Sequence, residues 1–487
     1  TGEILNASVL IYNDVVKLNN MWRFTQTAQI DPRVRAKKMP KEVMDESLEY
    51  VVAHEIGHTL GMMHNMSASA AFPVDSLRSA SFTRKYGTTP SIMDYARFNY
   101  VAQPGDKGLK LTPPMLGCYD EFAIKWLYSP IAGNLDVFGE AKVVESWVDE
   151  KAGDPLYRYG KQQIYSRYDP SAIEEDLGDD PMKASEYGIK NLKYIMEHLN
   201  EWIDDDASTA HRQFLYEGIV TQYYRYLVNV LYNVGGIYLT EVKDGTPGER
   251  YQAVDAKRQS ASLKWVVKQL LDSEWLENED VVSKFGLSAT TANSKVYAGL
   301  MAKLLEANLN VLVSSHVAGG DYTQANYYND LYNSIFAKTI SGKKLNRLDK
   351  AVQRGVLQTF AKQMETLTGA KKLTNVAAFT PSIDEVFAYG LDEIGILAAF
   401  KDQLQAVEQE NGCGTVMNEL RLHQFGDTYG YGFQKVVDMK LYDESLAHYT
   451  TMYVKLLNLM KSKALTAHKD DRAHYQSMVV ALELLKK

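Results

Sequence analysis

The sequence predicts an α+β fold in which a mixed N-terminal region is followed by a mostly α-helical C-terminal region. Residues 3–12 read as a β-strand, because they are rich in Ile, Leu and Val. Residues 40–60 carry apolar side chains at the spacing of a helix. Beyond residue 181 helical spacing continues almost throughout. These three observations place the strands mainly near the N-terminus.

In the N-terminal region we expect helices over about 14–28, 40–60 and 113–128. Pro40 suits the first turn of the second helix, because the N–H that proline lacks has no partner there. Gly61 is placed to end that helix, since glycine tolerates the left-handed conformation found at many helix ends. Residues 65–112 read as irregular, and 131–180 as a mixed linking segment with short strand candidates.

In the C-terminal region a predicted hairpin, 237–239 with 251–254, interrupts a series of predicted helices. The domains expected from these patterns are 1–130, the mixed segment 131–180, and one or more helical domains over 181–487. The predicted helices cover about 182–203, 207–234, 256–272, 290–317, 322–338, 345–367, 440–462 and 469–486.

Composition excludes several classes of protein. The 487 residues carry a formal net charge of −8, so a nucleic-acid-binding surface is not expected. No run of 18 or more apolar residues is present, which argues against a membrane span in this chain. The two cysteines, Cys118 and Cys413, are too few for a disulfide framework. The oligomeric state is not predicted by any of these features.

The most informative stretch is HEIGHTLGMMH, residues 54–64. His54 and His58 are four residues apart, so on a helix they share one face and reach one metal ion. Gly61 ends the helix and turns the chain back, which lets His64 approach as a third ligand. Glu55 lies beside the metal position and reaches a water there without binding the ion itself. Three protein ligands leave a position open, as in catalytic zinc sites.

This stretch resembles the extended zinc-binding motif of the metzincin metallopeptidases. The resemblance implies one catalytic Zn²⁺, with Glu55 as general base and then acid in peptide-bond hydrolysis. Met93, in Ser-Ile-Met-Asp-Tyr at 91–95, matches the family's methionine turn, and Tyr95 matches a tyrosine that either ligates zinc or hydrogen-bonds the oxyanion. Asp120 is similar to the aspartate that braces this turn, and Gly61 is the structural glycine of the motif.

The same resemblance predicts a metzincin-like catalytic domain with a helical C-terminal extension, as in large secreted bacterial metzincins. It implies a secreted, periplasmic or cell-surface enzyme whose substrate is a protein or peptide that pairs with the strand at 3–12. Only 53 residues precede His54, which is short for this family. We therefore expect the N-terminal sheet to be incomplete here, with its earlier strands upstream or in another chain.

Three alternatives stay open at the level of sequence. The first is a catalytically inactive protein of metzincin fold whose helical region recognises a partner. The second is a zinc hydrolase that acts on a non-peptide substrate. The third concerns the acidic stretch 174–180, which we interpret as a solvated loop and helix cap, with a calcium site as the alternative. The remaining histidines lack ligand spacing to one another and are interpreted as structural or exposed.

Overall fold

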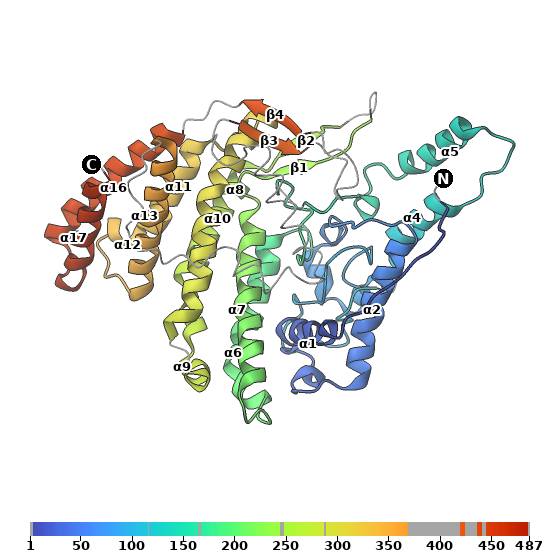
Figure 1. Cartoon of the computed structure of the whole chain (residues 1–487), viewed down its shortest axis with the longest axis horizontal. Coiled ribbons are helices and arrows are strands. Elements are labelled where there is room, and N and C mark those ends of the chain that lie inside the picture. The colour runs from blue at the N-terminus through green and yellow to red at the C-terminus, as the bar shows by residue number, and fades with distance from the viewer. Residues whose placement is uncertain are drawn as a thin grey trace. The chain divides into compact units, whose positions relative to one another are not determined.

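The computed structural model describes residues 3–114, 116–163, 167–243, 248–286, 289–368, 419–423, 436–440 and 445–485. The chain forms two compact units, which are described separately here (Figure 1). Unit 1 contains Thr1–Ile164 and Ser171–Asn229, and unit 2 contains Tyr165–Pro170 and Val230–Lys487. The main division thus lies near residue 230, whereas the sequence placed divisions at 130 and 180.

The fold is α+β, with helices predominating and the strands confined to short hairpins. In unit 1 the predictions of helices near 14–28, 40–60, 182–203 and 207–234 are confirmed. The helix expected from 113 begins only at Cys118, after Pro113 and Pro114. The helices of unit 1 are α1 (Asp14–Thr27), α2 (Lys41–Thr59), α3 (Ala80–Tyr86), α4 (Cys118–Tyr128), α5 (Val137–Asp149), α6 (Pro181–Trp202) and α7 (Ala210–Leu231), the last ending just past the division.

The predicted strand at 3–12 is wrong, because this segment forms no strand in the structure. Strands need a neighbour that accepts and donates their backbone hydrogen bonds. The two hairpins found among the described residues lie elsewhere in the chain, so 3–12 has no such neighbour. Its apolar side chains face solvent, and Leu5 is 88% exposed. The strand candidates within 131–180 are likewise not strands among the residues described there, where α5 is present instead.

Two packing arrangements build the interior of unit 1. Met21 and Trp22 of α1 pack against Phe98 in a small buried cluster. Helices α6 and α7 run side by side (Figure 1), and Gly188 of α6 faces the ring of Tyr226 so closely that a Cβ would lie 2.6 Å from it. Close helix packing at glycine is thus what brings α6 against α7.

Unit 2 is built of long helices and small antiparallel hairpins. The first hairpin pairs β1 (Ile237–Leu239) with β2 (Tyr251–Ala253), which confirms the predicted hairpin. A second, unpredicted hairpin pairs β3 (Glu419–His423) with β4 (Val436–Lys440). The helix predicted over 322–338 is interrupted at Phe336. The helices are α8 (Ala256–Leu271), α9 (Glu279–Val282), α10 (Ala289–Val317), α11 (Gln324–Ile335), α12 (Ala337–Ile340), α13 (Arg347–Thr368), α16 (Ser445–Thr466) and α17 (Lys469–Leu484).

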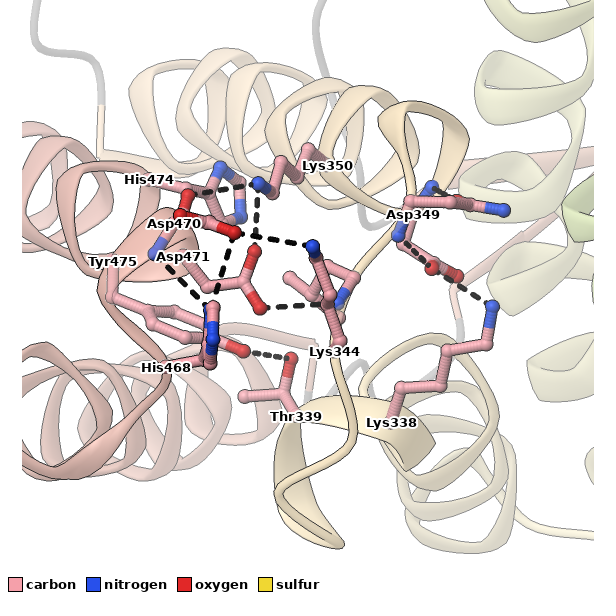
Figure 2. Close-up of polar contacts among 12 residues, drawn as sticks. Lys338, Thr339, Lys344, Asp349, Lys350, His468, Asp470, Asp471, His474 and Tyr475 are labelled. Carbon is pink, nitrogen blue, oxygen red and sulfur yellow. Dashed lines mark hydrogen bonds and ion pairs between the residues drawn. The ribbon is translucent and has the colours of Figure 1, made fainter.

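A polar cluster joins the first turns of α17 to α12, to the first turn of α13 and to the segment between these two helices (Figure 2). The buried carboxylate of Asp471 accepts a hydrogen bond of 3.1 Å from the backbone N–H of Leu345 and lies 2.7 Å from Lys350 Nζ. The Tyr475 hydroxyl donates to Thr339 Oγ1 over 3.3 Å. A buried charge is tolerated when it is paired and hydrogen-bonded in this way.

Among the described residues, no helix combines the length and the apolar character that crossing a membrane requires. Cys118 lies at the start of α4, and Cys413 lies outside the described residues.

Candidate metal centre

Three histidine side chains converge at the C-terminal end of α2. His64 Nε2 lies 3.1 Å from His54 Nε2 and 3.0 Å from His58 Nε2. Two ligand nitrogens held tetrahedrally at 2.0–2.1 Å from zinc stand about 3.4 Å apart. The three ring nitrogens face one another, and their separations are close to this value. The donor set therefore fits a zinc ion.

The opposite ring nitrogen of each histidine is also engaged. His54 Nδ1 donates to the backbone oxygen of Ile92 over 2.6 Å, and His58 Nδ1 donates to that of Met62 over 2.9 Å. His64 Nδ1 donates to the side-chain oxygen of Gln162 over 2.8 Å. Because these oxygens only accept, each Nδ1 carries the proton and each Nε2 presents a lone pair. This is the tautomer that binds a metal through Nε2.

Burial also keeps two of these imidazoles neutral. It lowers the pKa of His54 well below the ordinary value, and the nearby His64 and His58 lower it further. Burial, followed by the proximity of His58, lowers the pKa of His64 to about 3. Metal binding requires an unprotonated nitrogen, so the folded protein holds both rings in the form that zinc needs.

The turn after α2 explains how His64 reaches the other two rings. The helix ends at Thr59, and Gly61 adopts a φ of +87°, in the left-handed region that glycine tolerates best. The N–H of Met62 then returns to the carbonyl oxygen of Gly57 over 3.0 Å. This closes the turn and points the chain back along the helix, as the sequence predicted.

Glu55 lies beside the histidine cluster on α2 and is partly exposed. Within the stretches of chain that the structure describes, its carboxylate takes part in no hydrogen bond or ion pair. The neighbouring residues His54 and Gly57 are buried. Glu55 is thus the acidic group of this helical turn that remains available to a water or substrate.

Met93 lies beneath the cluster, within the predicted turn at 91–95. It is fully buried and packs with Met62 and Ile92. A Cβ added at Gly57 would lie only 2.5 Å from Met93 Sδ, so the sulfur sits directly against the backbone of α2. The N–H of Asn65 donates to the carbonyl oxygen of Met93 over 3.0 Å. The turn and the ligand helix are therefore in direct contact.

Tyr95 is the last residue of this turn, and its ring faces the histidines. Its ring centroid lies 4.6 Å from that of His64 and 5.2 Å from that of His54. The guanidinium carbon of Arg97 lies 4.4 Å from the same ring centroid. Tyr95 is therefore next to the candidate site, as the resemblance implied, and whether it ligates a metal stays a prediction.

Asp120 of α4 fixes the predicted turn through hydrogen bonds. Its buried carboxylate accepts from the Ser91 hydroxyl over 2.6 Å and from the N–H groups of Ile92 and Gly117 over 2.9 and 2.7 Å. Ile92 is also the residue whose carbonyl oxygen orients His54. Asp120 thus connects α4, through Ile92 of the turn, to the candidate ligand His54.

Sequence reasoning missed two residues of the site, Gln162 and Glu174. The side-chain oxygen of Gln162 accepts from His64, and its nitrogen donates to Glu174 Oε1 over 3.1 Å. Gln162 lies 98 residues after His64. No local spacing connects the two, so the sequence carries no signal for the contact.

The acidic stretch at 174–180 differs from the prediction of a solvated loop, because residues 174–178 are buried. The N–H of Glu175 donates to the carbonyl oxygen of Tyr95 over 3.0 Å, and the Ser69 hydroxyl donates to Asp176 over 3.3 Å. The predicted helix cap is present, since Asp180 accepts from the first turn of α6. The alternative of a calcium site has no support, because the histidines form the sole cluster of potential ligands found in the described ranges.

A protein-family model described as Met-zincin matches residues 36–343, more than half of the chain. No curated protein and no solved structure matches. The matched range includes the three histidines, the turn at 91–95, Asp120 and the segment that carries Gln162.

Proposed function

Because the chain belongs to the Met-zincin family, we propose that it is a zinc-dependent endopeptidase that hydrolyses peptide bonds in proteins or peptides. The observation that carries this proposal is the convergence of the Nε2 atoms of His54, His58 and His64 beside Glu55, whose carboxylate has no hydrogen-bond partner within the described part of the chain. The family and the three histidines together point to zinc, whether or not the protein cleaves peptides.

Each residue of the site has its own proposed role in hydrolysis. His54, His58 and His64 would hold one zinc ion, which supplies Lewis acidity and lowers the pKa of water to about 7. Glu55 takes the proton of the attacking water and passes it to the leaving amine. Tyr95, whose ring faces His64 and His54, donates its hydroxyl proton as a hydrogen bond to the oxyanion that forms on the scissile carbonyl.

Met93 and Asp120 have supporting roles in the proposal. Met93 fills the space against Gly57 and so seats the ligand helix on the turn. Asp120 fixes the turn, including the carbonyl oxygen that orients His54. We also propose a location outside the cytoplasm, which rests on the resemblance to large secreted bacterial metzincins. Residues 3–12 form no strand, so the substrate-pairing role expected of them has no support.

The proposal is tested by Glu55→Gln. We expect this variant to bind zinc like the wild type and to lose peptide cleavage by at least about 10²-fold, because it removes the proton acceptor alone. The measurements are zinc content and cleavage of a peptide library followed by mass spectrometry, with and without a chelator. Glu42→Gln, an exposed change in the first turn of the same helix, is the matched control and should leave cleavage unchanged.

Two outcomes would contradict the proposal. If the wild type binds zinc but cleaves no peptide, the inactive binding protein or a hydrolase of non-peptide substrates becomes the better interpretation. If Glu55→Gln cleaves as fast as the wild type, Glu55 is not the general base.

A further inference from the structure

The third histidine is oriented differently from the first two. His54 and His58 donate from Nδ1 to the backbone oxygens of Ile92, in the turn at 91–95, and Met62, in the same motif. His64 donates instead to a side chain, that of Gln162. A backbone oxygen always accepts, whereas a side-chain amide accepts or donates according to which end it presents. The orientation of His64 therefore depends on what holds Gln162.

Glu174 determines which end of the Gln162 amide faces His64. The Gln162 nitrogen donates to Glu174 Oε1 over 3.1 Å, and Glu174 is buried. The Glu174 oxygen is the acceptor of this bond, so the NH₂ end of the amide faces Glu174. The oxygen end is left for His64, whose Nδ1 must then carry the proton. The chain Glu174–Gln162–His64 thus leaves the lone pair on His64 Nε2, toward the other two histidines.

The backbone beside Gln162 is anchored next to His64. The N–H of Met66 donates to the carbonyl oxygen of Gly160 over 2.8 Å, and the N–H of Gly160 donates to Asn65 Oδ1 over 2.9 Å. A Cβ at Gly160 would lie 1.9 Å from the Ser67 hydroxyl oxygen, so only glycine permits this approach. The segment from 158 to 163 is therefore seated against the residues that follow His64.

We propose that Gln162 and Glu174 are positioning residues that select the metal-binding tautomer of His64 and fix its ring. This inference rests on the proposed function, because it concerns the same zinc site. It adds that a segment about a hundred residues beyond the motif belongs to the site. Residues that orient metal ligands typically contribute 10- to 100-fold in metal affinity.

The test compares zinc dissociation constants, measured by competition with a chromophoric chelator. Gln162→Met keeps the length of the side chain and removes both polar ends, and we expect it to weaken zinc binding by about 10- to 100-fold. The swap Gln162→Glu with Glu174→Gln restores an acceptor for His64 and a donor between the two side chains. We expect the swap to recover most of the affinity. Circular dichroism of the metal-free variants checks that each one folds.

The matched control is Gln163→Met. Gln163 is the next residue, is equally half-buried, and its side-chain nitrogen donates to the carbonyl oxygen of Ala172 over 3.0 Å. The Gln163→Met variant removes this hydrogen bond and leaves the one between Gln162 and His64 in place. We therefore expect its zinc affinity to equal that of the wild type. A loss in Gln163→Met as large as that in Gln162→Met would show that the role is structural and would overturn the inference.

The remaining outcomes separate this inference from the proposed function. If the wild type binds zinc and Gln162→Met binds it equally well, the positioning role is wrong and the zinc peptidase proposal stands. If the swap binds zinc no better than Gln162→Met, the tautomer argument is wrong. If the wild type itself binds no zinc, the proposed function fails, and the positioning role fails with it.

Discussion

At the scale of single residues, burial keeps histidines neutral in both units. It lowers the pKa of His64 in unit 1 to about 3, with a further contribution from His58. It lowers the pKa of His474 in unit 2 to about 4, with further contributions from Arg354 and Lys350. At His64 the neutral form suits metal binding. His474 shares a 3.0 Å hydrogen bond with Gln353. Its lowered pKa makes the free energy of unfolding depend on pH.

The sign of this pH dependence follows from the two pKa values of His474. The unfolded chain takes up a proton near pH 6.5, whereas the folded protein does so only near pH 4. Between these values the unfolded state binds more protons. The stabilisation is therefore complete above pH 6.5 and is lost as the pH falls toward 4, by at most about 1.4 kcal/mol per pH unit.

We therefore expect the unfolding temperature of His474→Gln to fall less between pH 7.5 and pH 5.0 than that of the wild type. Thermal unfolding followed by circular dichroism at the two pH values provides the measurement. His316→Gln, at an exposed histidine, is the control and should show the same fall as the wild type. Equal falls in all three proteins would show that His474 does not titrate in this range.

At the scale of secondary-structure elements, the contact between α2 and the turn at 91–95 depends on one glycine. Gly57 lies between His54 and His58 on α2, and its missing side chain makes room for Met93 Sδ. A glycine in a helix normally costs about 1 kcal/mol relative to alanine. Here alanine is the less favourable residue, because its Cβ would overlap the sulfur of Met93.

Gly57→Ala should therefore destabilise the protein by about 1–3 kcal/mol, the usual range for overpacking a core. The same substitution at Gly355 of α13 is the control, because its Cβ would meet Met301 Cγ at an ordinary 3.6 Å. Gly355→Ala should be neutral or stabilising by up to about 1 kcal/mol. Urea unfolding of both variants measures the difference. A Gly57→Ala protein as stable as the wild type would show that Met93 does not press on α2 in this way.

At the scale of the whole molecule, every group assigned to the site lies in unit 1. The ligands come from α2 and the turn after it, the brace from α4, and the positioning residues from 158–163 and 171–176. Unit 2 contributes none of these groups. A ligand that binds only the folded state stabilises the structure around it by mass action, by about 2.7 kcal/mol at a hundredfold excess over its dissociation constant.

Zinc should therefore slow hydrogen exchange in unit 1 near the histidines, in peptides covering 54–66, 89–97 and 158–163. Peptides of α13 and α17 in unit 2 should exchange at the same rate with and without the metal. Hydrogen exchange followed by mass spectrometry, before and after removal of zinc with a chelator, measures both. Protection that is spread equally over α17 would contradict a zinc site confined to unit 1.

The sequence by itself determined the features that depend on neighbours in the chain. Helical spacing predicted α2, α8 and α10 to within a few residues of their ends. The separations of His54, His58 and His64, with a glycine between the last two, were enough to predict that their rings converge. These features follow from the period of the helix and from the φ angles open to glycine, so no distant contact is needed to derive them.

The tertiary structure decided everything that depends on distant partners. Residues 3–12 have the composition of a strand, yet no second strand of the described ranges lies beside them to accept their hydrogen bonds. Glu174 and Asp176 are acidic, yet they are buried, because donors such as the Ser69 hydroxyl and the Gln162 amide meet their carboxylates. Gln162 reaches His64 only because Gly160 allows its segment to approach. The pairing of strands, the burial of the acidic side chains and the approach of Gln162 to His64 all depend on tertiary packing. Local residue patterns do not determine that packing.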